Sequence, residues 1–212
     1  TVVDPHMMKN SEWGAVAYLS QNATYGKGEE VWINPNSNYI TGQAGSSVSA
    51  EETTSSDAYN EGNGPQASTT GNVTGIYDMS GGAWEYVAGY INNESVVEGK
   101  EEYNLLKSLI QAENKYKDVF RVSATDEMED NYLLMTPING YYGDGIYETS
   151  GTGESNSGSW NADCSNFPKK ETPTIARGGA SDYQSGAGLF CFFWGVGGTA
   201  NYDAFRITIP VF

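Results

Sequence analysis

The chain contains 212 residues, of which 27 are acidic and 11 basic, and its formal net charge is −16. This length suits one large domain or two small ones, and we expect a single domain over residues 1–212. The negative charge disfavours binding to nucleic acid or to an anionic membrane surface, because both would be repelled. The sequence has no apolar run long enough to span a bilayer, so membrane insertion by this fragment is not expected.

The composition is rich in aromatic residues and glycine, with 15 Tyr, 5 Trp and 26 Gly. Tyr, Ser, Gly and Asn together are typical of loop-rich recognition surfaces. An acidic extracellular protein whose aromatic side chains are mostly buried would have the same composition. Composition alone therefore leaves both interpretations open.

The first predicted element is a short amphipathic helix over residues 10–21, NSEWGAVAYLSQ. The side chains at helical spacing are Trp13, Val16, Ala17 and Ser20. Asn10 or Ser11 is placed to cap this helix, and Glu12 stands in its first turn, where a carboxylate is favourable.

Residues 29–42 predict a strand followed by an Asn-Pro turn. Residues 43–70 then lose nearly all large apolar side chains and predict one long polar loop. The segments on either side of this loop are each too poor in apolar residues to fold alone. We therefore interpret it as a loop within one domain and not as a linker between two.

Residues 100–120 show the clearest helical pattern in the chain. The apolar stripe consists of Tyr103, Leu106, Ile110 and Tyr116, with Leu109, Val119 and Phe120 beside it. Residues 131–150 predict a loop with short extended pieces, and the Gly- and Ser-rich residues 151–159 predict mobility. Residues 175–212 contain three β-rich runs divided by glycines. Two helices, short antiparallel strands and much irregular backbone predict an α+β fold.

The segment at residues 71–87, GNVTGIYDMSGGAWEYV, combines glycines, aromatic residues and two carboxylates. Gly81 and Gly82 permit positive φ or a close backbone approach. Met79 and Trp84 supply apolar area to a core with few aliphatic side chains.

Asp78 and Glu85 are the two carboxylates of this segment. We expect them to accept hydrogen bonds from backbone amides of the long loops, or to pair with Arg177 and Arg206, which we expect to be buried. A fold with little regular backbone pairing must satisfy its loops through side chains. This segment is therefore interpreted as scaffold.

Three short motifs carry a family resemblance. Residues 75–87, GIYDMSGGAWEYV, resemble a segment of the formylglycine-generating-enzyme and sulfatase-modifying-factor group, a branch of the C-type-lectin-like fold. The motifs RGGAS at 177–181 and FRI at 205–207 match the R-G-G-S and terminal F-R of that group. The resemblance implies a C-type-lectin-like fold in which the structural residues are Asp78, Gly81, Gly82, Trp84, Glu85, Arg177, Gly178, Gly179, Phe205 and Arg206.

The resemblance to this group implies that an active enzyme would have two cysteines close together just before the terminal F-R. These cysteines would bind copper and the substrate thiol. Here Cys191 is near that position, but Cys164 lies 27 residues upstream, so the pattern is not met. The two cysteines also lack zinc-site spacing, and whether they pair stays open. His6 is the only histidine and gives little support to imidazole chemistry. We therefore expect no enzyme activity.

The chain more closely resembles another branch of the fold, the variable proteins diversified by retroelements in phages and bacteria. Residues 8–21, MKNSEWGAVAYLSQ, and 70–90, TGNVTGIYDMSGGAWEYVAGY, resemble still more closely surface proteins of gut bacteria, some of which carry a pilin-like or lipoprotein-like leader. In the variable proteins, variation lies between R-G-G and the final F-R, which implies a variable ligand-binding region at residues 177–206. The resemblance implies a bacterial or phage-encoded protein that is extracellular or on the cell surface, with its anchoring segment absent from this chain.

Within this region we interpret residues 180–204 as the display segment. It is crowded with residue types that adenine-directed mutation of Asn codons produces, although Gln184 and Trp194 do not fit. The side chains expected to face outward and bind ligand are Ala180, Ser181, Asp182, Tyr183, Cys191, Phe193, Trp194, Tyr202 and Asp203. Strand alternation places at least one of Leu189, Phe190 and Phe192 in the core.

The expected function is therefore ligand binding without catalysis, with a protein or another surface ligand as partner. The alternatives are a formylglycine-generating-type oxidase and a structural pilin-like subunit. No EF-hand loop and no sugar-reading E-P-N or Q-P-D triplet occurs, so calcium-dependent sugar binding is not expected. A structural calcium ion held by loop carbonyls and carboxylates stays open, and no other cofactor is expected.

Overall fold

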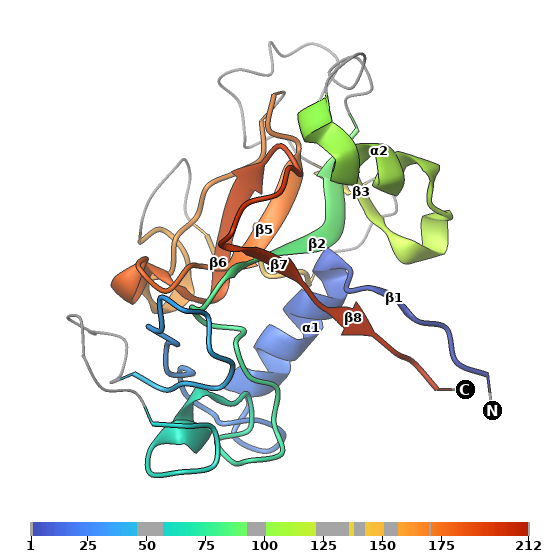
Figure 1. Cartoon of the computed structure of the whole chain (residues 1–212). Coiled ribbons are helices and arrows are strands. Elements are labelled where there is room, and N and C mark those ends of the chain that lie inside the picture. The colour runs from blue at the N-terminus through green and yellow to red at the C-terminus, as the bar shows by residue number, and fades with distance from the viewer. Residues whose placement is uncertain are drawn as a thin grey trace.

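The computed structural model describes residues 2–45, 57–92, 101–121, 136–137, 143–150, 157–169 and 171–211. Across these ranges the chain combines two α-helices with short strands and much irregular backbone (Figure 1). The predicted α+β class is confirmed.

The central sheet is organised around β2 (Trp84–Ile91). One edge of β2 pairs antiparallel with β5 (Thr174–Gly178), which continues to β6 (Gly188–Gly195). The other edge pairs in parallel with two strands, first with β7 (Asp203–Phe205) and then with β3 (Asp118–Arg121). A short strand, β4 (Thr136–Pro137), pairs with β3. The sheet is thus mixed, whereas we expected antiparallel strands.

The two ends of the chain lie side by side (Figure 1). Here β1 (His6–Met7) pairs antiparallel with β8 (Ile207–Thr208). The bridge between Val3 and Val211 extends this pairing outward. Of the helices that the structure describes, none has the length and apolar character needed to cross a bilayer.

The first predicted helix is confirmed as α1 (Asn10–Gln21). It begins at Asn10, so the capping position is Lys9 and neither Asn10 nor Ser11 takes that role. The Glu12 carboxylate accepts a hydrogen bond from the Lys9 amide at 2.9 Å. On its buried face, the Trp13 indole N–H donates to the Leu189 carbonyl at 2.8 Å, which ties α1 to β6.

The second predicted helix is too long. A 3₁₀ turn (Glu101–Tyr103) leads into α2 (Asn104–Gln111), and the chain then forms a second 3₁₀ turn (Asn114–Tyr116) and strand β3. The Lys117 ammonium donates to the carbonyls of Leu109 and Ile110 at 2.9 and 2.8 Å and satisfies the end of α2. Pairing of β3 with β2 supplies backbone hydrogen bonds that override the helical pattern.

The strand predicted within residues 29–42 is absent as a regular element from this described segment. Asn34 forms an isolated bridge with Gly81, and Val31 and Ile33 are buried. The described part of the predicted loop at 43–70 consists of turns and one 3₁₀ helix (Gly64–Ala67). The remainder, 46–56, lies outside the described residues, as do 131–135, 138–142 and 151–156 of the other predicted loops.

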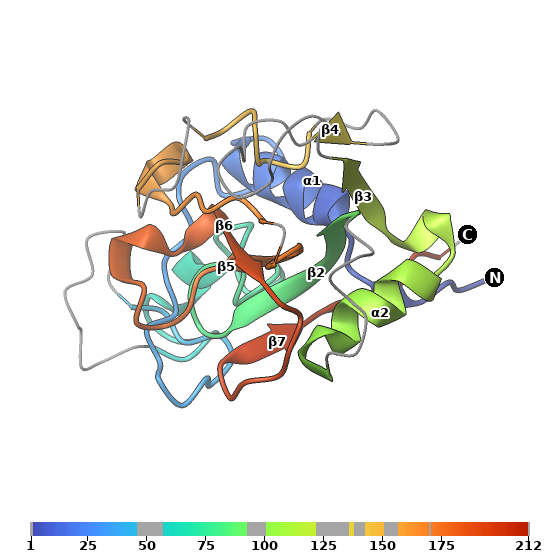
Figure 2. The same ribbon diagram turned by 90° about the horizontal axis from the view of Figure 1, so that it is seen from above.

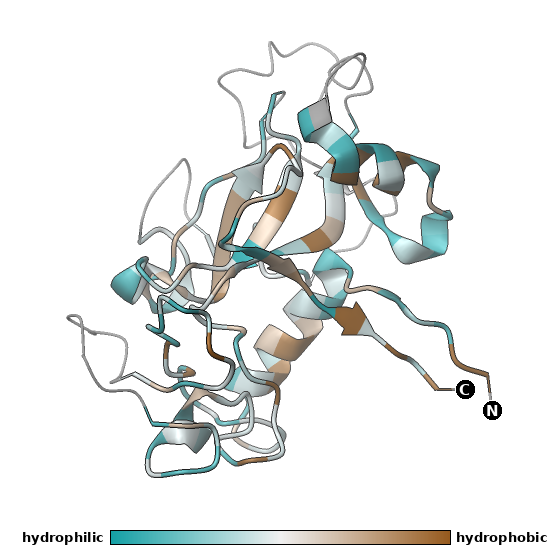
Figure 3. Cartoon of the chain, viewed as in Figure 1, coloured by the Kyte–Doolittle hydropathy of each residue, from teal (hydrophilic) through white to brown (hydrophobic). Residues whose placement is uncertain are grey.

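The two faces of the sheet are covered differently (Figures 2 and 3). Helix α1 covers one face, over a core that includes Trp13, Val87 and Phe192. On the opposite face, α2 packs against the far end of β2, with Leu106 beside Tyr90. The other half of that face has its own cluster: Trp84, Cys164, Ala176, Ala180 and Cys191, with Tyr86, Tyr183 and Phe193 packed against it. No residue of either helix belongs to this described cluster.

The scaffold interpretation of the 71–87 segment agrees with its contacts. Gly81 and Gly82 have φ of +75° and +73°, a region that favours glycine. The Asp78 carboxylate accepts hydrogen bonds from the Gly42 amide at 2.9 Å and from the Asn34 side chain at 2.8 Å. Asp78 thus satisfies a loop amide, as expected.

Glu85 forms a bidentate ion pair with Arg206, which agrees with the expectation that a carboxylate of this segment pairs with an arginine. The Arg206 guanidinium also donates to the Tyr77 carbonyl at 3.2 Å. Phe205, which we expected to be structural, is 62% exposed, so its side chain lies outside the core. Its backbone pairs with Tyr86 in the parallel β2–β7 ladder, and this pairing leaves the ring at the surface.

Arg177 is fully buried and is followed by Gly178 and Gly179, which have φ of +85° and +78°. A Cβ atom on Gly179 would lie 2.7 Å from the Ala187 Cα, so a larger residue does not fit there. These residues bend the chain out of β5 toward the 180–187 loop, which then leads into β6.

Cys164 and Cys191 form a disulfide bond, which answers the question that the sequence left open. Both residues are fully buried beneath Trp84 and Ala176. The bond joins the chain before β5 to the middle of β6.

We predict that the double variant Cys164→Ala/Cys191→Ala has a free energy of unfolding lower by about 3 kcal/mol, because the bond restricts the unfolded chain over a separation of 27 residues. Urea denaturation of the oxidised protein and of the variant measures this difference. Reduced wild-type protein serves as the control and should lose a similar amount. Equal midpoints for oxidised protein and variant would contradict the prediction.

Candidate ligand-binding surface

An aromatic patch covers the half of the sheet face that the helices leave free. We define it as Trp84, Tyr86, Tyr183, Phe193 and Tyr202, together with Trp194, which pairs with Ile175 in the β5–β6 register and joins the patch through its contact with Phe193 at the edge strand β6. Its centre is a cross-strand row in which Ala176 of β5 stands opposite Tyr86 of β2 on one side and Phe193 of β6 on the other. Alternation along each strand therefore brings the two rings to one face.

The rings of the patch contact one another. The Trp84 ring centroid lies 4.9 Å from that of Tyr183 and 5.2 Å from that of Phe193. Phe193 in turn lies 4.7 Å from Trp194. Aromatic pairs at these separations contribute about 0.5–1.5 kcal/mol each beyond their buried area, so the rings support one another.

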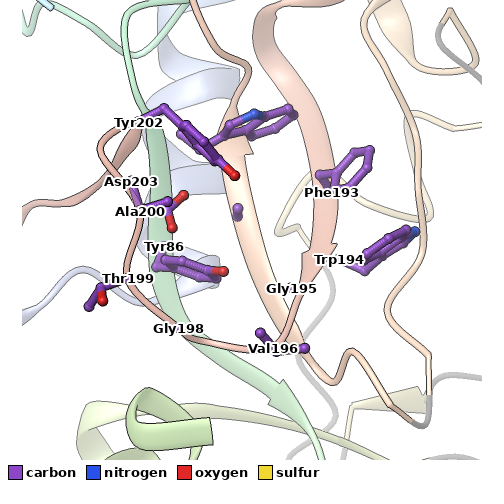
Figure 4. Close-up of a pocket in the computed structure, with 12 residues that line it drawn as sticks. Tyr86, Phe193, Trp194, Gly195, Val196, Gly198, Thr199, Ala200, Tyr202 and Asp203 are labelled. Carbon is purple, nitrogen blue, oxygen red and sulfur yellow. The ribbon is translucent and has the colours of Figure 1, made fainter. Parts of the chain in front are cut away.

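A hollow of about 330 Å³ lies in this patch (Figure 4). Its lining includes the patch residues Trp84, Tyr86, Phe193, Trp194 and Tyr202, together with Ala176, Asp203 and the turn at residues 195–200. Ala176 makes room for it, because its short side chain stands between two large rings.

A second hollow, of about 380 Å³, adjoins the first. The two share Tyr86, Asp203 and residues 198–200 as lining. The second continues past Leu105 at the start of α2 to the exposed ring of Phe205. Together they form a recess that is apolar for most of its length.

The polar groups of the recess are few. Burial raises the pKa of the Asp203 carboxyl. Burial, together with the nearby Asp203 carboxylate, raises the pKa of Tyr86 to about 12, so its hydroxyl stays protonated at neutral pH. At the rim, the Lys169 ammonium lies 5.5 Å from the centre of the Trp194 ring. The residues lining the first hollow include no His, Cys, Lys or Arg.

Most of the side chains predicted to bind ligand reach the surface. Tyr202 is 51% exposed, and Tyr183, Phe193 and Trp194 are half-buried with part of each ring accessible. Of the rest, Asp182 is exposed, and Ser181 and Asp203 are half-buried. Leu189, Phe190 and Phe192 are all buried, in agreement with the expectation that at least one belongs to the core.

Two predictions of outward residues are wrong. Cys191 is fully buried because its sulfur is bonded to Cys164 beneath the patch. Ala180 is 5% exposed because its methyl group packs inward. The chain turns directly after it, and the Tyr183 amide donates to the Ala180 carbonyl at 3.0 Å. Both residues support the patch from below.

The sequence interpretation missed Tyr86 and Ala176 and assigned Trp84 to the scaffold alone. The signal was present in WEYVAGYI, where Trp84 and Tyr86 alternate with the buried Glu85 and Val87. Period-two alternation places both rings on one face, but it does not reveal which strand pairs with β2.

Within the described ranges, no group of three or more His, Cys, Asp or Glu side chains is arranged to hold a metal ion. In comparisons with known proteins, no family model, no curated protein and no solved structure matches this chain.

Proposed function

We propose that this chain is a ligand-binding protein of receptor or adhesin type, without catalytic activity, and that the aromatic patch is its binding surface. The observation that carries the proposal is the group of partly exposed rings, Phe193, Trp194 and Tyr202, around a hollow in the free half of the sheet face. Aromatic side chains with polar residues at their rim are typical of binding surfaces.

The rigidity of the patch supports this function. Trp84, Tyr183 and Phe193 hold one another in place, and the disulfide underlies them. Rings that are already ordered lose little conformational freedom when a partner binds, so more of the contact energy becomes affinity. Asp182 and Ser181, at the edge of the patch, add polar contacts.

The anchoring of the display segment supports the further proposal of a C-type-lectin-like variable protein. Arg177 precedes residues 180–204 and is held in the core, and Arg206 follows them and is paired with Glu85. Both ends are therefore tied to the scaffold, and substitutions on the outward side chains between them leave these anchors intact. A protein displayed by a bacterium or a phage would use such a segment to change its ligand.

We predict that Tyr202→Ala and Trp194→Ala each reduce binding to a cell-surface partner by roughly fivefold or more, since exposed aromatic anchors contribute about 1–2 kcal/mol. The assay titrates fluorescent protein onto a panel of bacterial and epithelial cells. Tyr25→Ala is the matched control, because Tyr25 is 71% exposed and lies outside the patch.

Thermal unfolding of each variant verifies that folding is retained. The proposal requires saturable binding of the wild-type protein to at least one surface of the panel, with loss in the two patch variants and none in the control. Absence of binding across the panel, or equal loss in all three variants, would contradict it.

A further inference from the structure

The chemistry of the first hollow restricts what can bind in it. This inference rests on the proposed function, because it names the ligand class of the same surface. Three of the aromatic walls are Trp84, Tyr86 and Tyr202, and the β2–β7 register places Asp203 directly opposite Trp84. In Figure 4 the Asp203 carboxylate lies between the rings of Tyr86 and Tyr202. A carboxylate and several ring faces therefore border one small space.

This combination favours a cation. The faces of aromatic rings carry negative potential and attract cations within about 6 Å of the ring centre. Asp203 adds a negative group in the same space, and the net charge of −16 raises the local concentration of cations and repels anions. No Lys or Arg lines the hollow itself, so an anionic group inside it would lack a compensating charge, and the Lys169 ammonium lies only at the rim.

The surface already contains one contact of this kind. The Lys169 ammonium lies over the Trp194 ring at 5.5 Å from its centre. Trp194 is also among the residues that line the hollow. A cation thus already lies against one ring of the aromatic patch.

The shortage of hydrogen-bonding side chains distinguishes among cations. A primary ammonium is strongly hydrated and needs several acceptors to replace its water. Here the polar side chains of the lining are Asp203, Thr199, the two tyrosine hydroxyls and the indole N–H groups, and no Asn or Gln is present. A methylated ammonium has little hydration to lose, and its methyl groups contact rings directly. The same shortage disfavours a sugar, which needs several directed hydrogen bonds.

We propose that the hollow bordered by Trp84, Tyr86, Phe193, Tyr202 and Asp203 binds a quaternary or otherwise methylated ammonium group, such as that of choline or of a trimethylated lysine. Its volume of about 330 Å³ is sufficient for such a head group and leaves the remaining ligand to extend along the adjoining hollow.

Isothermal titration with choline tests the charge requirement, with 3,3-dimethylbutan-1-ol as the uncharged probe of the same shape. We expect choline to bind saturably and at least roughly tenfold more tightly than the alcohol. Equal affinities, or no saturable binding of choline, would overturn the proposal.

Variants then locate the site. Asp203→Asn and Tyr202→Leu should each weaken choline binding by roughly fivefold or more, and Glu61→Gln should leave it unchanged, because Glu61 is exposed and lines neither hollow. Choline binding that survives both lining variants would also overturn it.

The outcome is separable from that of the cell-surface assay. If partner binding depends on Tyr202 and Trp194 but choline does not bind, the ligand class is wrong and the binding surface stands. Saturable binding of methyl glucoside or N-acetylglucosamine in place of choline would reject the cationic ligand in favour of a sugar.

Discussion

The Arg177→Met variant is expected to have a free energy of unfolding lower by about 3–5 kcal/mol, the largest effect of any single substitution considered for this chain. The Arg177 guanidinium is fully buried and donates to the Asn10 side-chain oxygen at 3.0 Å and to the Asp144 carbonyl at 3.1 Å. It also donates to the carbonyls of Gly145 and Leu189, both at 3.3 Å. Methionine is unbranched like arginine but shorter and apolar, and it leaves all four acceptors without this donor.

The charge of Arg177 persists in the core. Burial lowers the pKa of Arg177 to about 10, while nearby Asp144 opposes this shift, so the guanidinium is protonated at neutral pH. The methionine variant thus also leaves the Asp144 carboxylate without its positive neighbour. Removing one partner of a buried ion pair lowers stability more than replacing both partners with apolar residues, because the remaining charge is left uncompensated.

Urea denaturation followed by tryptophan fluorescence and near-ultraviolet circular dichroism measures the effect. Lys115→Met is the matched control, because Lys115 is exposed and pairs with Asp4 at the surface, so this variant should have nearly the same urea midpoint as the wild type. Arg177→Lys keeps the charge and should lie between wild type and Arg177→Met. An Arg177→Met variant within 1 kcal/mol of the wild type would contradict the prediction.

Arg177 also illustrates what the sequence can predict. Its burial followed from the motif at residues 177–181, but its partners did not. Asn10 lies in α1 and Asp144 in a turn region that carries no strong pattern, at separations of 167 and 33 residues. Nothing in local periodicity connects such positions, because contacts across a fold are set by how its elements pack.

The two helices give the complementary lesson. The pattern at 10–21 predicted α1 correctly, because its apolar stripe is also the stripe that the sheet buries. The pattern at 100–120 failed beyond Gln111, because Val119 and Phe120 fit a strand equally well and β2 offered a free edge for pairing. A helical pattern in one segment gives no information about a free sheet edge that another segment forms.

The aromatic patch was predicted in part. Phe193, Trp194 and Tyr202 were predicted to face outward because they lie in the display segment that the resemblance implies, and all three are partly exposed. Tyr86 and Ala176 come from other strands and join them through the register of β2 with β5 and of β5 with β6. The hollow depends on a small residue between two rings, which is a property of the register and not of any one segment.

A second large effect is expected from pH. Raising the pH from about 4 to about 7 should lower the free energy of unfolding by more than about 3 kcal/mol, in contrast to proteins whose carboxylates are stabilised by ion pairs. Burial raises the pKa of Asp144 from 3.8 to about 6 and the pKa of Glu30 from 4.5 to about 7. Burial, with the nearby Glu30 charge, also raises the pKa of Asp163 well above its ordinary value.

The sign follows from proton binding. A carboxyl group whose pKa is higher in the folded state holds its proton after the unfolded chain has released it, so folding becomes less favourable as pH rises between the two values. At about 1.4 kcal/mol for each pH unit, Asp144 alone accounts for about 3 kcal/mol, since it is 6% exposed. Glu30 contributes less because it is partly solvated, and Asp163 acts in the same direction.

Asp163→Asn isolates one part of this effect, because asparagine has the shape of the protonated carboxyl group and does not titrate. Asp163 is fully buried, and its Oδ2 accepts a hydrogen bond from the Phe190 amide at 2.8 Å, at the start of the strand that carries Phe193 and Trp194. We therefore expect the variant to match the wild type at pH 5 and to lose less stability by pH 7.5. Urea titrations at both pH values, with the exposed Asp182→Asn as control, measure the change in slope. If the free energy of unfolding of Asp163→Asn fell with pH as steeply as that of the wild type, the prediction would be wrong. Asp163 would then be ionised in the folded protein, as a buried charge beneath β6.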